Sequence, residues 1–589
     1  MRVYHTKDFT RVAALPRRGP VDHAALQAKW TEKLGRKNDR CKCATFGRMC
    51  CNQIRPIQAQ ALEEISTQGG LLGPIGVGHG KSLVDLLAAF ALPGVKKAVL
   101  LLPPQLKVQM LEFDIPYYGE HWIMPNLASS EWHHPSRPNL YVVGYSELSS
   151  KKGTDLLMRI KPDLIIADEA HALRKPSAVR TSRFYGLMAH LPQTKFIAMS
   201  GTLVSKSFMD WAPMAKQALK EGSPAPLFHP DMELWAKALD PSDEQIEPGV
   251  LEQFCEPGMP VGLGYGVHVI STPGVVSSGD AASCNSSLVV EAVYPLMPPE
   301  CKAAIKDLER TWTRPDGEEL MWQFDYLRAL DTLSLGFYFR WKWVHNEPLD
   351  LRTEWLDSRA DWHKEVRQKL KHPRPHLDSP GLLNDAAKRF FRRDGTEQED
   401  EKPKWKAETW ERWQEVKDKC HPLPEAVWLS GALCDEALAW ANSTVGIVWT
   451  AWPCFGQRVV SSSRGSVQYL GAGDDAAREV TRLSGRESVV LSSRAHGTGR
   501  NLQQFSRNLL CSVPGNGTEF EQILGRTHRQ GQLADEVTVQ VWQHSGRYRE
   551  TFDKAETLAN YIQEAMGTNQ RLASVAQYLN FASPIKGTK

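Results

Sequence analysis

The sequence predicts an α/β protein with two doubly wound parallel sheets and a mostly helical region between them. Short apolar runs alternate with helical patterns over residues 54–215, and the same alternation returns after residue 440. Residues 216–440 break this rhythm. Strands that alternate with helices at this spacing form parallel sheets, whose ligands bind at the carboxyl ends of the strands. The functional residues are therefore expected at two such sheet edges.

The bulk properties are those of a globular protein of several domains. A chain of 589 residues is too long for one core, and its 42% hydrophobic and 24% charged residues are ordinary values. The net charge of +3 makes any nucleic-acid surface local rather than global. We find no apolar run of about 18 residues and no signal-peptide core. We expect a cytoplasmic protein, in the host cytoplasm if the source is viral, with no membrane partner.

The predicted strands follow the apolar runs. In the first half they are residues 96–104, 139–146, 163–171 and 195–202; in the second half they are 445–450, 466–470, 488–492, 507–512 and 536–542. One further strand is predicted at 287–294, and residues 300–420, including 339–343, are interpreted as helices. The predicted domains are 1–53, a basic cysteine-containing extension; 54–215, the first lobe; 216–440, the insert; and 441–589, the second lobe with C-terminal helices.

The N-terminal extension contains Cys41, Cys43, Cys50 and Cys51. Four thiols this close are a candidate Zn²⁺ site, because zinc accepts four sulfur ligands. The spacing is not that of two C-x2-C pairs, and adjacent cysteines do not easily face the same metal. Free thiols in a small subdomain are the other interpretation, and the 11 cysteines overall are typical of a reducing compartment.

A glycine-rich stretch, residues 73–82, lies between a predicted strand and a predicted helix. Such a turn aims several backbone N–H groups and the positive end of the helix dipole at one point, which favours a bound phosphate. Lys81 would reach the outer phosphates and Ser82 would bind Mg²⁺. Ile75 stands where the phosphate-loop pattern expects its first glycine, with glycines at 76 and 78 instead.

Two further sets of charged residues complement this loop. Asp168 and Glu169 end a hydrophobic strand in the same predicted sheet, where Asp168 can hold Mg²⁺ and Glu169 can polarise an attacking water. Arg526 and Arg529 in the second half are three residues apart and would share one face of a helix. Two guanidinium groups that face a γ-phosphate stabilise its transition-state charge.

Taken together, these motifs resemble superfamily 2 helicases and, within them, the Swi/Snf-related DNA translocases in a DEAH-box form. The resembling segments are 55–58 (RPIQ, the Q motif, with Gln58 as adenine reader), 78–82 (motif I), 168–171 (DEAH, motif II), 200–202 (SGT, motif III), 496–502 (motif V) and 522–532 (QILGRTHRQGQ, motif VI). The chain departs from the family at Ile75, at Ser82 in place of threonine, and throughout the insert.

The resemblance implies two RecA-like lobes that bind ATP and Mg²⁺ between them and move along nucleic acid. It implies a catalytic set of Lys81, Asp168, Glu169, Arg526 and Arg529, and Mg²⁺ ligands Ser82 and Asp168. The implied nucleotide-binding set is Arg55, Gln58, Gly76, Gly78, His79, Gly80, Lys81, Ser82, Gly499 and Gln522.

The expected activity is ATP-dependent translocation on DNA, with double-stranded DNA favoured and single-stranded DNA as an alternative. A strand-separating helicase ranks second and a motor on RNA third. A scaffold that binds ATP or nucleic acid without hydrolysis is an alternative of another class.

The insert bears on the nucleic-acid partner. Most of the 19 tryptophans lie between Trp312 and Trp452, and we interpret most of them as core. The surface candidates for phosphate contact are Arg340, Lys342, Arg389, Arg392 and Arg393.

Overall fold

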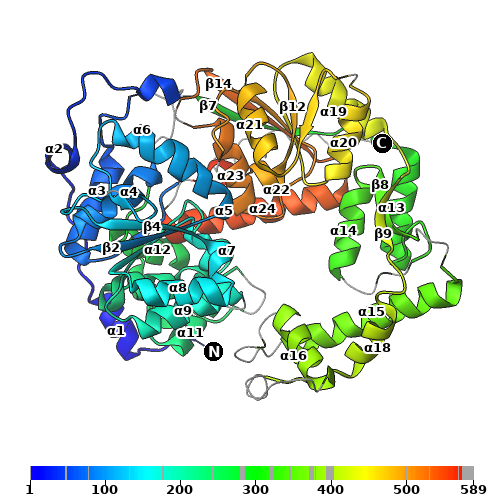
Figure 1. The fold of residues 1–589 in the computed structure, drawn as a ribbon, viewed down its shortest axis with the longest axis horizontal. Helices are drawn as coiled ribbons and strands as arrows, with labels where there is room; N and C mark the ends of the chain where they lie inside the picture. The colour runs from blue at the N-terminus through cyan, green and yellow to red at the C-terminus, as the bar shows by residue number, and fades with distance from the viewer. Residues whose placement is uncertain are drawn as a thin grey trace. The chain divides into compact units, whose positions relative to one another are not determined.

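The chain forms two compact units, and each is described by itself. The first unit comprises Met1–Arg174, Leu187–Met297 and Ala432–Lys589, and the second comprises Lys175–Gly186 and Pro298–Gly431. Figure 1 gives the element labels along the chain. The computed structural model describes residues 2–46, 50–76, 78–131, 133–175, 178–241, 245–278, 286–318, 320, 323–343, 347–370, 377, 380–392, 403–463, 465–483, 485–497, 500–529, 531–567 and 570–573.

The first unit contains a six-stranded parallel sheet in the order β1-β6-β5-β2-β4-β3. Its central strands are continuous apolar runs with buried side chains, as expected for a sheet covered on both faces. The strands are β1 (Leu71–Gly73), β2 (Lys97–Leu102), β3 (Asn126–Leu127), β4 (Asn139–Gly144), β5 (Leu164–Asp168) and β6 (Lys195–Met199).

The register of this sheet brings three polar segments to the same edge. Met199 of β6 pairs with Gly73 of β1 on one side and with Asp168 of β5 on the other. The segments that follow these three strands therefore leave the sheet side by side. The helical elements of this part are α3 (Pro56–Gln68), α4 (Lys81–Ala91), α5 (Pro104–Gln109), the π-turn η2 (Met110–Asp114), α6 (Ile115–Gly119), α7 (Tyr145–Leu148), α8 (Lys151–Ile160), η3 (Ala170–Leu173), η4 (Phe208–Asp210), α10 (Ala212–Leu219) and η5 (Lys220–Gly222). Helix α9 (Val179–His190) begins in the second unit and ends in the first.

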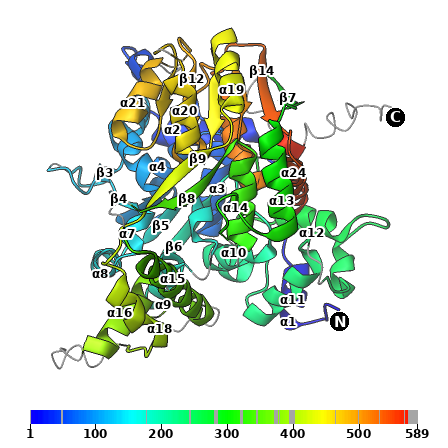
Figure 2. The same ribbon diagram turned by 90° about the vertical axis from the view of Figure 1, so that its right-hand side faces the viewer.

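A second six-stranded parallel sheet has the order β11-β12-β10-β13-β14-β7. Its edge strand β7 (Ser287–Val293) comes from the region that was expected to be a mostly helical insert, and it pairs along its full length with β14 (Glu536–Trp542), as Figure 2 shows. The remaining elements are β10 (Ile447–Thr450), β11 (Gln468–Leu470), β12 (Val489–Ser492), β13 (Arg507–Leu510), α19 (Ala432–Ser443), α20 (Pro453–Ser461), α21 (Asp474–Leu483), α22 (Ser493–His496), α23 (Gly517–Thr527) and α24 (Gly546–Met566).

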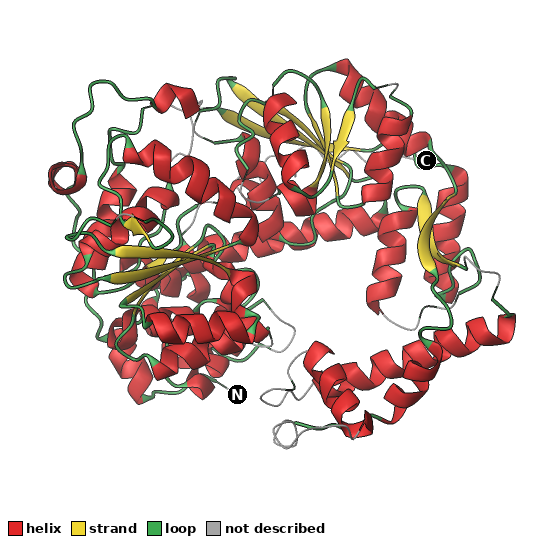
Figure 3. Cartoon of the chain, viewed as in Figure 1, coloured by secondary structure: helices red, strands yellow, loops and turns green. Residues whose placement is uncertain are grey.

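Two doubly wound parallel sheets flanked by helices confirm the predicted fold class of two RecA-like lobes (Figure 3). Helix α24 follows the second sheet and packs on α12 (Val261–Ser271), which lies in the segment after the first sheet. The Tyr561 hydroxyl donates to Asp240 Oδ1 at 2.8 Å, and the Ser277 hydroxyl donates to the Met566 carbonyl at 2.9 Å. These contacts tie α24 to the segment that follows the first sheet.

The second unit combines helices with a two-stranded antiparallel sheet. The prediction of a helix at 339–343 is wrong, because this segment lies in β8 (Phe337–Lys342), which pairs with β9 (Leu423–Trp428). Phe337, Phe339 and Trp341 alternate with polar residues, which is the periodicity of a strand rather than a helix. The helices are α13 (Pro299–Thr311), α14 (Gln323–Leu333), α15 (Leu349–Leu370), α16 (Pro380–Arg392) and α18 (Glu408–Val416).

The tryptophans of this unit are largely packing residues, as predicted. Trp355, Trp362, Trp405 and Trp410 are buried. Trp362, Trp405 and Trp410 form a core between α15, α16 and α18. Among the described helices, none, including the 22-residue α15, is long and apolar enough to cross a membrane.

Two of the five cations proposed for phosphate contact already share an acidic partner. Arg340 and Lys342 are about half exposed, and both pair with Glu425 on the neighbouring strand, at 2.9 and 3.0 Å. Arg389 donates to the Pro403 carbonyl. The Arg392 side chain and Arg393 lie outside the part of the chain that the structure describes.

The basic N-terminal segment is integrated into the first unit. Arg11 donates to the Ser223 and Ala225 carbonyls at 2.7 and 2.6 Å, and Arg18 forms an ion pair with Glu64. Its positive charges are thus partly used inside the fold. The helical elements here are α1 (Lys7–Ala13), α2 (His23–Leu34) and η1 (Cys43–Phe46), followed later in the chain by α11 (His229–Leu239) and η6 (Gly249–Phe254).

His268 anchors this segment to α12. Its imidazole Nδ1 accepts a hydrogen bond from the Arg17 guanidinium, which also donates to the His268 carbonyl at 3.1 Å. Burial, and then the positive charge of Arg17, lower the pKa of His268 to about 3. The imidazole therefore stays neutral in the folded protein.

This shift predicts an acid-sensitive contribution to stability. Because the unfolded chain binds the proton near the ordinary pKa of 6.5 and the folded chain only near 3, this contribution is complete above pH 6.5 and is lost as the pH falls toward 3. His268→Gln keeps an acceptor for Arg17 but does not titrate. The melting-temperature difference between wild type and this variant should shrink between pH 7 and pH 4; parallel curves would contradict the assignment.

Candidate functional site

The glycine-rich stretch forms a loop between β1 and α4, as predicted. Gly78 and Gly80 have φ values of 95° and 76°, in the left-handed region that glycine adopts without strain. Gly80 caps α4, and Lys81 is the first residue of the helix. The first amide groups of a helix have no intrahelical acceptor and carry the positive end of the dipole. The loop thus has the features of an anion site; Val77 lies outside the described residues.

Ile75 contributes its backbone to this loop. Its side chain is buried in the core of the first lobe, and its carbonyl accepts a hydrogen bond from Lys81 Nζ at 3.2 Å. The neighbouring Gly76 amide donates to Ser278 Oγ at 3.1 Å. The departure from the phosphate-loop pattern at Ile75 therefore leaves the turn intact.

Arg55 and Gln58, at the start of α3, support the loop from the other side. The Arg55 guanidinium donates to the Gly78 carbonyl at 2.5 Å, and Gln58 Nε2 donates to the Gly80 carbonyl at 2.8 Å. Gln58 Oε1 accepts from the Arg55 amide, so both ends of this amide side chain already have protein partners. A role of Gln58 in reading adenine stays a prediction.

His79 lies buried between cations. Burial, followed by the charges of Lys81, Arg571 and Arg55, lowers the pKa of His79 to about 4. The imidazole is therefore neutral near pH 7 and adds no charge to the loop.

Asp168 and Glu169 lie at the end of β5, beside the loop. Glu169 has a φ of 53°, a strained conformation for a residue with a side chain, and such strain is concentrated at functional sites. The Glu169 amide donates to Asp168 Oδ1 at 2.9 Å, and the Tyr145 hydroxyl donates to the Asp168 carbonyl at 2.9 Å. Burial, and then the charge of Glu169, raise the pKa of Asp168 to about 7.

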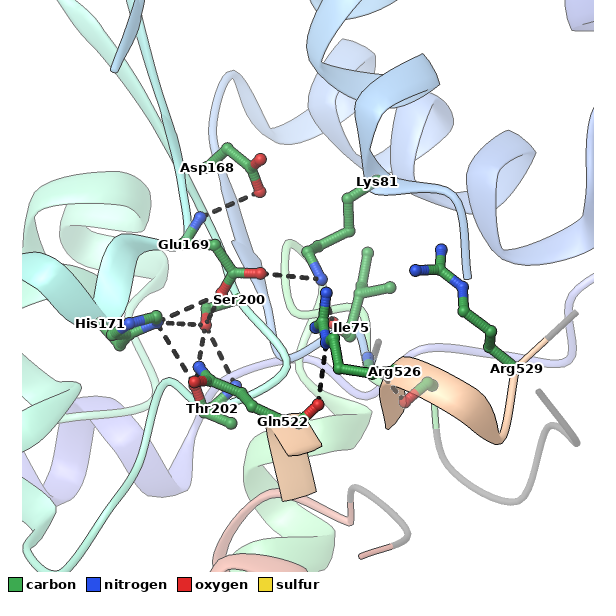
Figure 4. A network of polar contacts seen from close by, with 12 residues as sticks. Ile75, Lys81, Asp168, Glu169, His171, Ser200, Thr202, Gln522, Arg526 and Arg529 are labelled. Carbon is green, nitrogen blue, oxygen red and sulfur yellow. Dashed lines mark hydrogen bonds and ion pairs between the residues drawn. The ribbon is translucent and has the colours of Figure 1, made fainter. Parts of the chain in front are cut away.

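Glu169 is the centre of a polar network (Figure 4). Its carboxylate lies 3.6 Å from Lys81 Nζ, accepts from the Ser200 hydroxyl at 2.8 Å and lies 3.2 Å from His171 Nδ1. Burial alone would raise the pKa of Glu169, but Lys81, His171 and Ser200 outweigh it and hold the pKa below its ordinary value. The carboxylate is therefore ionised and held in place from three sides.

Asp85 is a functional candidate that the sequence did not reveal. It lies on α4, one turn after Lys81, and neither carboxylate oxygen has a hydrogen-bond partner among the described residues. Burial, and then the charge of Asp168, raise its pKa well above the ordinary value. The only sequence signal was one acidic residue in an otherwise apolar helix.

The arginines of the second lobe differ from the prediction in one respect. Helix α23 ends at Thr527, so Arg529 lies beyond the helix and does not share a helix face with Arg526. The chain turns at His528, and the left-handed Gly531 follows shortly after. Both guanidinium groups still share one acceptor, because Arg526 and Arg529 each donate to the Arg500 carbonyl, at 3.0 and 3.3 Å.

The second lobe contacts the network around Glu169. Gln522 Nε2 lies 3.4 Å from the Thr202 hydroxyl, which itself lies within hydrogen-bond distance of Ser200 and His171. Burial lowers the pKa of Arg526 to about 10, partly offset by the negative charge of Glu169. Arg526 thus stays charged and interacts electrostatically with Glu169 of the first lobe. Gly499 lies outside the described residues.

The residues present fit a triphosphate with a divalent cation. The buried Asp168 and unpartnered Asp85 and the half-buried Glu169 are acids in one region, and a cation would offset their repulsion. Ser82 follows Lys81 in the first turn of α4, so its hydroxyl and the Asp168 carboxylate are the candidate Mg²⁺ ligands. Lys81, with Arg526 and Arg529, supplies positive charge for phosphates.

The cysteine cluster differs from the predicted set of four thiols. Cys41, Cys43 and Cys50 come together with His121, and one ligand atom of each lies within 4.8 Å of all the others. Cys51 does not belong to this group, although its Sγ lies 3.6 Å from Cys43 Sγ; the same Sγ also faces the Tyr117 carbonyl at 3.3 Å.

No protein-family model matches the chain, and no curated protein matches it. Among solved structures it is similar to two of Saccharomyces cerevisiae Dbp5 bound to RNA and ADP BeF3, one of them a point variant. The variant is 12% identical, with 89% of this chain and 92% of that chain covered and a TM-score of 0.37. The other is 11% identical, with 86% and 87% covered and a TM-score of 0.38. Similarity this low does not bear on function.

The loop geometry predicts different effects for two glycine substitutions. A Cβ at Gly80 would lie 2.4 Å from Gln58 Nε2, whereas a Cβ at Gly94, which has a similar φ of 81°, meets nothing within 4 Å. Gly80→Ala and Gly94→Ala should each lose about 1–2 kcal/mol of stability from backbone strain. Only Gly80→Ala should also bind a fluorescent ATP analogue more weakly, by at least about tenfold. Equal affinities would show that the Gln58 contact does not shape the loop.

Proposed function

We propose that the protein is an ATP-dependent nucleic-acid motor of superfamily 2, which hydrolyses ATP between its two lobes. The observation that carries this proposal is the contact of Gln522 in the second lobe with Thr202 in the network around Glu169, to which Arg526 adds an electrostatic interaction with Glu169. A site built from charged groups of two lobes can change the relative position of the lobes when the bound nucleotide is hydrolysed. That coupling is what distinguishes a motor from a simple nucleotide hydrolase.

Each residue has a role that follows from its surroundings. The loop amides and Lys81 bind the phosphates, and Glu169, which is ionised, orients and polarises the attacking water. Ser82 and Asp168 would hold Mg²⁺, which neutralises phosphate charge when bound. Arg526 and Arg529 stabilise the charge that develops on the transferred phosphoryl group.

Ser200 and Thr202 link hydrolysis to the second lobe. Ser200 donates to Glu169, Thr202 is within 3.2 Å of Ser200, and Gln522 reaches Thr202. A shift of Glu169 during hydrolysis therefore changes hydrogen bonds that include a residue of the other lobe.

Double-stranded DNA is the proposed track. This choice rests on the similarity of residues 522–532 to the Swi/Snf-type motif, and translocation needs only the two lobes. Strand separation, which needs an additional wedge, is the second possibility, and RNA is the third. A scaffold that binds without hydrolysis is disfavoured by the ionised Glu169 and by the arginines that meet at Arg500.

The decisive measurement is the ATPase rate with no nucleic acid, single-stranded DNA, duplex DNA and RNA in parallel. We expect the largest stimulation, at least about tenfold, with duplex DNA. Lys81→Ala should abolish turnover under all four conditions because the phosphates lose their main cation. Lys97→Ala, which removes an exposed lysine at the opposite end of the same sheet, is the matched control and should turn over normally.

The outcomes separate the alternatives. Stimulation by RNA alone would show that the track is RNA and not DNA. Displacement of a labelled strand would indicate a helicase. Binding of ATP without turnover in any condition would support the scaffold. Wild-type turnover in Lys81→Ala would reject the assigned phosphate loop.

Two variants should separate hydrolysis from binding. Glu169→Gln keeps the size of the side chain but loses its charge, so the rate should fall at least about a hundredfold while ATP affinity changes little. Arg529→Ala should lower the rate by about a thousandfold with nearly unchanged affinity and melting temperature. Arg526→Ala should also lower the melting temperature, because Arg526 is buried and holds the Gln522 and Arg500 carbonyls. A weaker affinity for ATP in Glu169→Gln, at an unchanged rate, would contradict these roles.

A further inference from the structure

A cluster of three thiols and one imidazole shares no residue with the proposed ATP site. The thiols of Cys41, Cys43 and Cys50 come from the N-terminal extension, and His121 follows α6 of the first lobe. Cys50 Sγ lies 3.2 Å from His121 Nε2 and 3.8 Å from Cys41 Sγ. In a tetrahedral zinc site with Zn–S bonds of about 2.3 Å, neighbouring sulfur atoms are about 3.8 Å apart. The spacing of the cluster is thus already that of a metal site.

We propose that Cys41, Cys43, Cys50 and His121 form a structural Zn²⁺ site. Three thiolates and one imidazole are soft and borderline ligands that select zinc and disfavour magnesium or calcium, which prefer oxygen. Four protein ligands leave no open coordination position, so the site is structural rather than catalytic.

Cys51 is left out of the ligand set because it does not join the four mutually close ligand atoms, although its Sγ lies 3.6 Å from Cys43 Sγ. Its side chain is buried, and its Sγ faces the Tyr117 carbonyl at 3.3 Å, a contact in which only a protonated thiol can donate. Cys51 is thus buried against Tyr117, while the adjacent Cys50 is exposed and lies against His121.

The two segments that carry the ligands are held in register by the backbone. The Arg36 amide donates to the His121 carbonyl at 2.7 Å, and the Ile123 amide donates to the Leu34 carbonyl at 2.9 Å. The Trp122 indole donates to the Cys51 carbonyl at 2.7 Å. The fold therefore brings the ligands together before any metal binds, which lowers the entropic cost of forming the site.

Glu120 adds a second layer of support. Its carboxylate accepts from the Lys42 amide and from Asn38 Nδ2, both at 2.9 Å. Lys42 lies between Cys41 and Cys43, and Glu120 directly precedes His121. These bonds therefore join the two segments that carry the ligands. Such outer contacts orient metal ligands.

The site would stiffen the start of α3. Cys51 is followed within four residues by Arg55, whose guanidinium holds the Gly78 carbonyl of the phosphate loop. Arg55 also lies near Tyr117 and Tyr118, in the helical segment that precedes His121. Loss of zinc should therefore make the position of Arg55 less fixed and weaken the binding of ATP. This effect on ATP affinity is the one consequence that rests on the proposed function.

The test is metal analysis of the full chain, purified without a metal-affinity tag. We expect about one zinc per chain in the wild type. Cys41→Ser, Cys50→Ser and His121→Gln should each lose the metal. Cys51→Ser, which changes the adjacent thiol, is the matched control and should keep it. Chelation of the wild-type metal should lower the melting temperature, whether or not the protein hydrolyses ATP.

Cobalt substitution keeps the proposal testable if the variants fail to fold. Wild-type protein loaded with Co²⁺ should show the absorption of a tetrahedral site with three thiolates and one nitrogen. A four-thiolate spectrum, or zinc retained in His121→Gln and lost in Cys51→Ser, would overturn the ligand set. A disulfide between Cys41 and Cys50, or no metal after zinc reconstitution, would overturn the site itself.

Discussion

The ion pair between Lys81 and Glu169 is the contact on which the candidate site depends. Both side chains are largely buried, and isolated charges in such a position would cost several kcal/mol each. The cost is offset because the Ile75 carbonyl accepts from Lys81 and Ser200 donates to Glu169. The pair joins the loop after β1 to the end of β5, so the geometry of both segments is set at one point.

The parallel register makes this convergence possible. Gly73, Met199 and Asp168 end adjacent strands at the same level, and the chain then turns out of the sheet at each of them. Segments far apart in the sequence meet there without any long loop. The second lobe adds Gln522 from α23, a helix whose side chains are almost all buried, so its position is determined by the packing of the whole lobe.

Local patterns were sufficient where the chemistry is local. The loop that ends in Lys81 and the acids that end β5 were predicted because both motifs are continuous in the sequence and each follows an apolar strand. Arg529 was assigned to the wrong conformation because the end of α23 depends on a turn that spacing does not reveal. His121 was missed as a possible metal ligand because it is far from the cysteines in sequence, and only the fold brings them together.

The contacts of the loop also determine which bonds the proposed nucleotide would have to change. Arg55 and Gln58 donate to the carbonyls of Gly78 and Gly80 and so use none of the loop amides, although the Gly76 amide already donates to Ser278 Oγ. Lys81 is different, because its ammonium group is held by Glu169 and the Ile75 carbonyl. A phosphate that draws Lys81 away releases Glu169 from its strongest opposite charge. Under the proposed function, binding of the triphosphate would thus free the carboxylate that is proposed to polarise water.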